Sequence, residues 1–335
     1  MTTPTFPSFA EALRVWLRVG LLSFGGPAAQ IAVMHREVVD DRRWVSDARF
    51  LHALNFCMLL PGPEATQLAT YLGWLMHGVK GGVAAGLLFL LPGAAVMLAL
   101  SVIYATFGAV PVVAALFFGL KCAVLVLVVE ALLRVAKRAL HGVAAWSLAA
   151  AAFLALAAFA VPFPLVVLAA LGIGYVLPTA FVAGGHGKAT DGPPALLDAA
   201  IAAEPGRIAR MAPAARRAGL IALALWLWPV VLLNGVPIWG DIAWFFSKMA
   251  VVTFGGAYAV LAYVAQEAVD KYHWLTAPEM LAGLGLAETT PGPLITVVAL
   301  VGFVGGWQQA VLGPDALWVG AALAATVVTF FTFLP

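Results

Sequence analysis

Charged side chains are scarce in this sequence: Asp, Glu, Lys and Arg together make up only 10% of its 335 residues. An ordinary soluble domain carries about 25%, so this scarcity excludes a water-facing globular surface. Cysteine is rarer still. Cys57 and Cys122 lie in apolar surroundings without metal-ligand spacing, which favours a packing role over a disulfide or a metal cluster. The segment Met1–Glu11 has no basic stretch ahead of an apolar core, so we expect no cleaved signal peptide.

Motifs for catalysis and cofactor binding are also missing. The histidines are scattered and show no metal spacing. Gly81-Gly82 and Gly184-Gly185 lack both the strand–loop–helix setting and the Lys-Ser/Thr pair of a phosphate-binding loop. No nucleophile stands in a recognisable arrangement with a base. We therefore expect neither an enzyme nor a bound metal or cofactor. The net charge of +2 comes from short loops and gives no reason to expect nucleic acid as a partner.

Apolar residues dominate the chain instead. Hydrophobic residues make up 63% of it, and the mean hydropathy is +1.00. Several stretches reach the roughly 20 residues that a helix needs to cross a bilayer. The sequence therefore predicts an all-α integral membrane protein that has lipid as a partner. Five stretches predict spanning helices: Gly81–Ala105, Ala109–Leu133, Val143–Ala160, Leu165–Val182 and Ala218–Leu233.

Two helix-breaking motifs each occur twice. Phe24-Gly25-Gly26 is followed by Pro61-Gly62-Pro63, and the pair returns 230 residues later as Phe254-Gly255-Gly256 and Pro291-Gly292-Pro293. The same offset relates further identical residues: Glu37 and Glu267, Asp40 and Asp270, Trp44 and Trp274, and Thr66 and Thr296. Repeated breaks inside apolar segments are typical of internally duplicated membrane transporters.

The segments around these motifs are too short to span a membrane one by one. Each has roughly 12 to 15 residues, or about 18–22 Å, against a hydrocarbon core of about 30 Å. We interpret them as broken, re-entrant helical hairpins whose tips lie at membrane depth. The arms in the first copy are Phe9–Ser23 with Ala28–Val39 and Asp47–Leu60 with Glu64–His77; the second copy has Ile242–Val269 and Pro278–Val304, and Leu317–Pro335 begins another span.

The number of spans predicts the orientation of the two copies. A hairpin returns the chain to the side it came from, and the five expected spans between the copies are an odd number. The second repeat is therefore expected to be inverted, whereas a sixth span would reverse this. We divide the chain into a first repeat with its following spans at 1–182, a mobile cytoplasmic linker at 183–217 and the second repeat at 218–335. Basic clusters within 36–49, 134–138 and 188–217 then share one face, which the positive-inside rule makes cytoplasmic.

The helix breaks are the predicted binding site. A break in lipid leaves N–H and C=O groups unpaired unless they face protein, water or a ligand. Pro27 and Pro63 suit the first turn of a returning helix, and helix N-termini near the bilayer midplane favour an anion. The alternative is that the glycines only permit close helix packing. The substrate-binding residues expected at the breaks are Gly25, Gly26, Gln30, Gly62, Gln67, Gly255, Gly256, Thr289 and Gly292.

Charged residues complete the predicted site. Arg18 and Lys248 lie 230 residues apart, before the two Phe-Gly-Gly motifs. Lys121 lies midway along an expected span, where a lysine costs about 2.5–3.5 kcal/mol and needs a partner. We expect all three to line an anion path; the alternatives are snorkelling to the interface for the first two and a structural ion pair for Lys121. Glu64 and Glu288 adjoin the Pro-Gly-Pro motifs. Either is a candidate proton carrier, because burial raises the pKa of a carboxylate, although Glu64 also suits a helix N-terminus.

Three segments taken together resemble the chromate ion transporter family in its two-domain form: Phe24–Ala32, Leu60–Ala69 and Ala287–Pro293. The resemblance covers nearly all of the chain, and the three motifs in this order are specific. It implies a multi-pass protein of the bacterial inner membrane that exports chromate from the cytoplasm. The export would be driven by the proton-motive force and would confer chromate resistance. Sulfate, which is a tetrahedral dianion of the same shape, would be the natural competitor.

The second half departs from the two-domain pattern. It ends at Phe333-Leu334-Pro335, where the first copy still has helices to come, so we expect a C-terminally incomplete second repeat. Other functions stay open at this point: uptake of sulfate or another oxyanion, an anion channel, or a membrane scaffold without transport. The oligomeric state is open as well, with a homodimer as one option.

Overall fold

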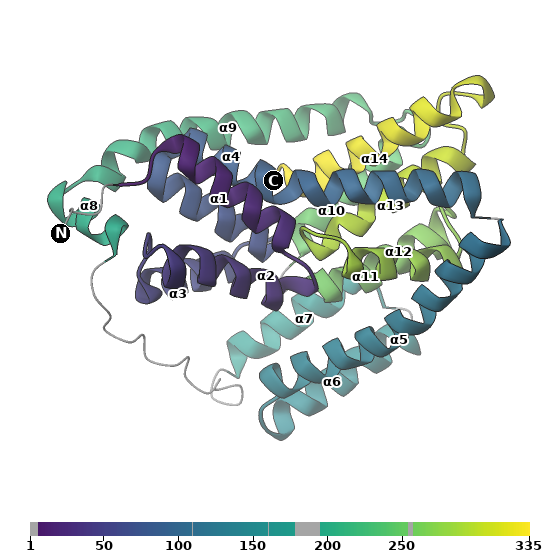
Figure 1. Ribbon diagram of the computed structural model, residues 1–335. Coiled ribbons are helices and arrows are strands. Elements are labelled where there is room, and N and C mark those ends of the chain that lie inside the picture. The colour runs from purple at the N-terminus through teal and green to yellow at the C-terminus, as the bar shows by residue number, and fades with distance from the viewer. Residues whose placement is uncertain (1–5, 109, 160, 178–194, 254–256) are drawn as a thin grey trace. The chain divides into compact units, whose positions relative to one another are not determined.

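The computed structural model describes residues 6–108, 110–159, 161–177, 195–253 and 257–335, and every element in these ranges is a helix or a helical turn (Figure 1). The all-α expectation is therefore confirmed for the described residues. The chain forms two compact units. Residues 1–120 and 189–335 make up the first, and residues 121–188 make up the second. The second copy's Phe254-Gly255-Gly256 lies outside the described residues.

The two copies contain the same elements in the same order within the first unit. The first helix of each copy has identical bounds after the offset of 230, and helices α3 and α12 both begin at residues with that offset. In the first copy the elements are α1 (Phe9–Leu22), α2 (Gly26–His35), the π-turn η1 (Arg36–Asp41), α3 (Asp47–Met58) and α4 (Glu64–Phe107). In the second copy they are α10 (Trp239–Val252), α11 (Ala257–Gln266), η3 (Glu267–Lys271), α12 (Ala277–Thr289), η4 (Leu294–Thr296), α13 (Val297–Gln308), η5 (Pro314–Ala316) and α14 (Leu317–Phe333).

The duplication extends to unusual backbone conformations. Each π-turn is followed by a non-glycine residue with a positive φ, Arg43 at 52° and His273 at 51°. In the next position, Trp44 donates its N–H to the Val38 carbonyl at 2.8 Å, and the equivalent bond of Trp274 has the same length. Such strained residues persist only where the surrounding structure holds them. The two copies therefore share a local fold and not only a motif.

Helix α4 is a pair of helical arms that fold back on one another. Its backbone is non-helical at His77 and at Gly78, whose φ is 67°. A Cβ on Gly73 would lie 2.4 Å from the Gly81 carbonyl oxygen, which is a contact that a straight helix would not allow because these residues would be about 12 Å apart. The arm expected at Glu64–His77 and the following apolar helix are thus both present. In the second copy α13 and α14 form the equivalent pair (Figure 1).

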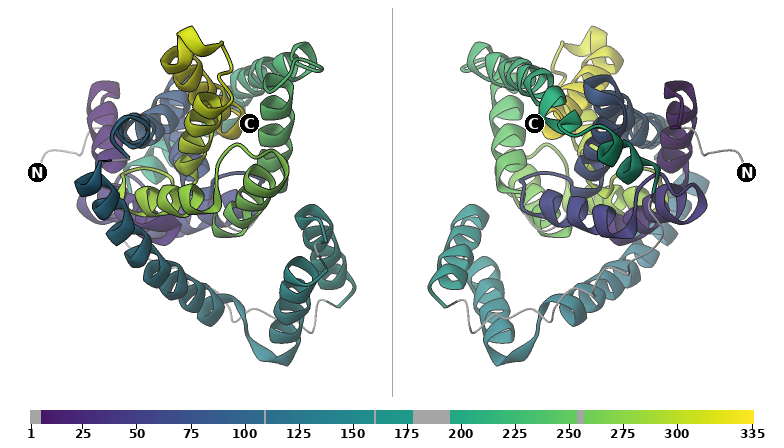
Figure 2. Two further views of the ribbon diagram at one scale, coloured as in Figure 1. Left: turned by 90° about the vertical axis from the view of Figure 1, so that its right-hand side faces the viewer. Right: turned by 90° about the vertical axis from the view of Figure 1, so that its left-hand side faces the viewer.

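The remaining helices are α5 (Pro111–Ala139), α6 (Gly142–Ala157), α7 (Phe163–Val176), α8 (Leu196–Ala203) and α9 (Arg207–Leu232). Three helical segments among the described residues are long and apolar enough to cross a membrane: Glu64–Phe107, Arg207–Leu232 and Pro314–Phe333. Helices α6 and α7 have only 16 and 14 residues and lie side by side in the second unit (Figure 2). They are shorter than the spans expected there. The predicted inversion of the repeats must therefore be judged from how the loops are arranged.

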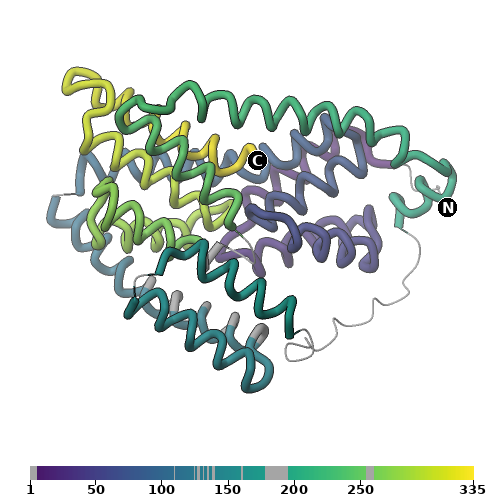
Figure 3. The backbone as a smooth tube through the Cα atoms, turned by 180° about the vertical axis from the view of Figure 1, so that it is seen from behind, coloured from purple at the N-terminus to yellow at the C-terminus, as the bar shows by residue number. Residues whose placement is uncertain are grey.

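The loops of the two copies gather at separate ends of the first unit (Figures 1 and 3). At the end near α8, His77 Nε2 lies 2.9 Å from the Pro7 carbonyl oxygen, and the Leu196 N–H donates to Arg43 O at 3.1 Å. At the end near the start of α14, the Gln308 amide donates to Glu279 Oε1 at 3.0 Å. Loops of the same copy therefore contact one another, as expected if each copy turns at its own end.

The expected mobile linker at 183–217 is largely wrong for its described part. Leu196–Ala203 and the residues from Arg207 onward are helical, and residues 178–194 lie outside the described ranges. Ala, Leu and Arg favour helix, and α8 is anchored: Leu197 is fully buried, and Asp198 Oδ1 accepts from Arg49 Nε at 2.6 Å. Burial raises the pKa of Asp198, but hydrogen bonds from Ser46 and Arg49 lower it further, so the net shift is downward.

Helix α9 shows why the charge content of the chain is low. It lies beside α4 and α10 (Figure 3) and exposes large apolar side chains, among them Leu220, Ile221 and Trp228 at 60–65%. In water this surface would be a large apolar patch. In a bilayer it is the expected lipid-facing surface, and the only polar groups that must be satisfied are those of the backbone.

Candidate functional site

Two backbone hydrogen bonds join the helix breaks of one copy to those of the other. Gly292 N–H donates to the Ser23 carbonyl at 2.8 Å, and Gly62 N–H donates to the Thr253 carbonyl at 2.8 Å. The donors are 230 residues apart, and so are the acceptors. A reciprocal pair of this kind is what a two-fold relation between the copies requires. The first break of each copy therefore meets the second break of the other.

The backbone at the Pro-Gly-Pro breaks explains their sequence. Gly62 has a φ of 121° and Gly292 a φ of 87°, and L-residues with side chains rarely adopt such values. Pro63 is the N-cap of α4, and Glu64 is the first residue of that helix. Pro27 lies in the first turn of α2. The expected placement of both prolines at the start of a returning helix is confirmed.

The second-copy break is closed by contacts from the first copy. Gln30, which is 1% exposed, donates its side-chain N–H to the Gly292 carbonyl at 2.8 Å. The second arm of α4 packs directly on the break, since a Cβ on Gly93 would lie 2.3 Å from the Pro291 carbonyl oxygen. Within the break itself, Thr296 Oγ1 donates to Pro293 O at 2.8 Å. These contacts leave little room beside Gly292.

The first-copy break adjoins a cavity of about 330 Å³. Polar side chains of the first α4 arm line it together with Pro61-Gly62-Pro63, and the end of α14 lines the other part. The Gln67 amide donates to the Pro61 carbonyl at 2.5 Å. Among the described residues, three buried polar atoms that line this cavity have no hydrogen-bond partner: Thr66 Oγ1, Gln67 Oε1 and Trp74 Nε1. The sequence analysis did not single out Trp74, which lies one helical face along from the break.

The predicted cations Arg18 and Lys248 are not equivalent in the structure. Arg18 Nε lies 3.0 Å from Glu37 Oε1, and Arg42 also pairs with this carboxylate, which is 1% exposed. Lys248 instead lies over the ring of Tyr263 at 5.5 Å. Glu37 was found in the sequence only as a repeated residue, although the repeat of a carboxylate in an apolar chain was itself a signal. The role of both cations in anion binding stays a prediction.

The other predicted residues are spread more widely. Gly25, with a φ of 73°, caps α2, and Gly26 begins it. Thr289 Oγ1 donates to the Gly285 carbonyl of its own helix at 3.1 Å, and Glu288 precedes it at the end of α12. Lys121 begins the second unit and is half-buried there, so the structure does not bring it together with the breaks. Gly255 and Gly256 lie outside the described residues.

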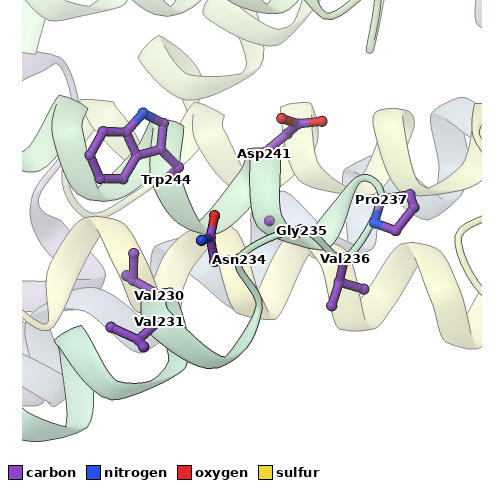
Figure 4. Close-up of a pocket in the computed structure, with 9 residues that line it drawn as sticks. Val230, Val231, Asn234, Gly235, Val236, Pro237, Asp241 and Trp244 are labelled. Carbon is purple, nitrogen blue, oxygen red and sulfur yellow. The ribbon is translucent and has the colours of Figure 1, made fainter.

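A wider cavity of about 680 Å³ lies at the turn between α9 and α10 (Figure 4). Its polar side chains are Asn234 and Asp241, and Trp244 also lines it. A carboxylate without a lining cation does not suit an anion. The cavity is built by the α9–α10 connection and includes none of the helix breaks. Size alone therefore does not identify the site, and the break cavity, with its unpartnered polar atoms, is the stronger candidate.

An apolar helical chain, duplicated and broken where its two copies meet, has the architecture of a membrane transport protein. Comparison with known proteins gives the family. Residues 10–175 and 240–335 match the chromate transporter family, and the chain belongs to that family. The matched residues include the described breaks of both copies.

Several relatives match over nearly the whole chain. The chromate transport protein of Pseudomonas aeruginosa is 34% identical over 97% of this chain and 73% of its own length. The chromate transport protein of Cupriavidus metallidurans is 29% identical over 100% of this chain and 75% of its own length. A probable chromate transport protein of Synechococcus elongatus is 27% identical over 96% of the chain and 75% of its own length. No solved structure matches this chain.

Proposed function

We propose that this protein is a secondary transporter that exports chromate across the bacterial inner membrane, is coupled to the proton-motive force and confers chromate resistance. The observation that carries the proposal is the reciprocal pair of hydrogen bonds from Gly62 and Gly292, which brings helix breaks of both copies to one place. Membership of the chromate transporter family and the printed names of the relatives support the choice of substrate.

The two repeats act as an inverted pair in this proposal. Support comes from the charges at the two ends of the first unit. The end with α8 carries Lys and Arg at 36, 42, 43, 49, 80, 207 and 210. The loops of the second copy carry Lys271 between Glu267 and Glu279. By the positive-inside rule the first end faces the cytoplasm, and the second-copy loops face the opposite side. Rocking of one copy against the other then exposes the breaks to each side in turn.

The breaks bind the oxyanion through helix N-termini and neutral hydrogen-bond donors. Backbone N–H groups at the start of α2 and α4 supply partial positive charge, and Gly25, Gly26, Gly62 and Gln67 lie at these starts. Arg18, Lys121 and Lys248 contribute positive charge along the path. Glu64 and Glu288 are the candidates for carrying the coupled proton because both adjoin a Pro-Gly-Pro break.

Counterflow in proteoliposomes tests the substrate and the coupling together. Purified protein is loaded with unlabelled chromate, sulfate or molybdate, and entry of radiolabelled chromate is followed at several pH values. We expect chromate to give the strongest exchange. Net chromate accumulation against its gradient should need an imposed pH difference and vanish with an uncoupler. Preferred exchange of sulfate would favour a sulfate transporter, and flux that only follows the chromate gradient would show a channel.

A double variant tests the charged residues. Lys121→Ala combined with Glu64→Gln removes one predicted cation and one predicted proton carrier. We expect proton-driven chromate transport to fall by at least tenfold while the amount of protein in the membrane is unchanged. Normal chromate efflux in vesicles from this variant would remove both residues from the mechanism.

A further inference from the structure

The two Pro-Gly-Pro breaks are equivalent in sequence but differ in hydrogen bonding. Thr66 and Thr296 occupy the same position after their breaks. Thr296 Oγ1 donates to Pro293 O, whereas Thr66 Oγ1, in a residue that is 9% exposed, has no partner among the described residues. The second-copy break is therefore satisfied by the protein. The first-copy break is left with buried polar atoms that need a partner from outside, since each costs about 1–3 kcal/mol if unpaired.

The unpartnered atoms lie on one side of one helix. Thr66, Thr70 and Trp74 are spaced i, i+4 and i+8 along the first arm of α4, and Gln67 lies beside Thr66. This spacing places side chains on a common face, and all four residues line the cavity beside Gly62. Thr66 and Trp74 can donate a hydrogen bond, and the indole can only donate.

The third unpartnered atom is an acceptor. Because the Gln67 amide N–H donates to the Pro61 carbonyl, its Oε1 is the atom that is left, and it is buried. An amide oxygen has no proton to give. A fully deprotonated oxyanion also has none, so the two would repel. A ligand that carries one hydroxyl hydrogen would satisfy all three atoms.

No lysine or arginine lines this cavity among the described residues. The titratable side chains around it are Cys57 of α3 and Tyr71 of α4, and Glu64 begins α4 next to Pro63. From α10 and α14 the lining residues are Ala250 and Thr332, which do not titrate. A pH dependence of binding can therefore come from Glu64 or from the ligand itself.

We infer that the first-copy break, and not the second, binds the oxyanion, and that it selects the singly protonated form of a tetrahedral oxyanion. Thr66 and Trp74 donate to two of its oxygens, while its hydroxyl donates to Gln67 Oε1. Hydrogen chromate loses its proton near neutral pH, whereas hydrogen sulfate does so only in strong acid. The same site therefore distinguishes chromate from sulfate, although the two anions share a shape. This inference rests on the proposed function, because it assigns that function's substrate to one break.

Equilibrium dialysis against purified protein in detergent tests the selected form without a proton gradient. The dissociation constants of radiolabelled chromate and sulfate are measured across the pH range in which chromate loses its proton. We expect the value for total chromate to rise roughly tenfold for each pH unit above neutrality, with weak sulfate binding that does not change. If both anions weaken in parallel, titration of the protein at Glu64 explains the effect and the protonated-ligand assignment is wrong.

Matched threonine variants test which break binds. Thr66→Val and Trp74→Phe each remove one donor at nearly constant shape, and each should raise the chromate dissociation constant about 5- to 10-fold. Thr66→Ser should restore it. Thr296→Val changes the same position of the second copy, where the hydroxyl is already paired, and should change the constant less than 2-fold. Equal losses from Thr66→Val and Thr296→Val would overturn the inference.

The transport assay separates this inference from the proposed function. Chromate counterflow by the wild-type protein together with unchanged binding in Thr66→Val and Trp74→Phe would refute the break assignment and leave the transporter proposal intact. Specific chromate binding with the expected pH dependence, but no counterflow in proteoliposomes, would refute transport and keep the binding site.

Discussion

Glu37 is the most deeply buried carboxylate in the described part of the chain, with an exposed fraction of 0%. It stays charged because Arg18 comes from α1 and Arg42 from the following turn to pair with it. Its counterpart Glu267 is paired only with Lys271, four residues along the same turn, at 2.9 Å. The same position thus links two helices in the first copy and makes a local pair in the second.

Replacing Glu37 should cost much more stability than replacing Glu267. Glu37→Gln leaves two arginines facing a neutral amide, and because both arginines are partly exposed we expect a loss of about 2 kcal/mol. Glu267→Gln breaks a helical i, i+4 pair and should cost less than about 0.5 kcal/mol. Thermal unfolding of the two variants in the same detergent measures the difference. Equal losses would show that the buried network does not join α1 to α2.

At the scale of elements, the close approach of α4 to the second-copy break depends on a missing side chain. Gly93 lies in the long second arm of α4, next to Pro92, and its backbone touches Pro291 and Gly292. Since the nearest atoms are backbone, a methyl group cannot be accommodated by turning a side chain. The arm and the break must separate, and the Ser23–Gly292 hydrogen bond lies in the same place.

Gly93→Ala should therefore destabilise the protein by about 1–3 kcal/mol, the usual range for overpacking, and reduce chromate counterflow. Gly219→Ala is the matched control, because Gly219 lies in α9 with nothing within 4 Å of its added Cβ. In a helix interior that change should be neutral or stabilising by up to about 1 kcal/mol. Thermal unfolding and counterflow are measured on both. A Gly93→Ala protein as stable as the control would mean that α4 does not hold the break.

At the scale of the whole molecule, the inverted arrangement makes a prediction about sidedness. Asp40 and Asp270 are register equivalents in the π-turns of the two copies, and both are exposed. In a background with Cys57 and Cys122 replaced by Ala, Asp40→Cys should react with a membrane-impermeant maleimide only from the cytoplasmic side. Asp270→Cys should react only from the opposite side.

Right-side-out and inside-out vesicles give the two measurements, and detergent-permeabilised vesicles show that each cysteine is reactive. Labelling of both cysteines from the same side would make the repeats parallel. The alternating-access proposal in its inverted form would then be wrong, although the meeting of the breaks would stand.

Much of the fold could be predicted because it is local. The starts of α3 and α12 follow from Ser46 and Thr276, whose side chains cap the helices. The breaks follow from glycine and proline. The connector was the main error: its polar composition suggested a mobile segment, but Leu197 and the Arg49–Asp198 pair hold α8 to the first copy. Contacts between residues about 150 positions apart leave no mark in the local sequence.

The sequence by itself determined that the protein is helical, lies in a membrane and is built from two copies with breaks at matching positions. Apolar composition and helix breakers act through the nearest few residues, so they can be recognised one segment at a time. Only the tertiary structure decided that Gly62 and Gly292 bond across the copies, and that Thr296 is satisfied while Thr66 is not. Two identical motifs acquire different hydrogen bonds because their neighbours in space differ, and those neighbours come from distant parts of the chain.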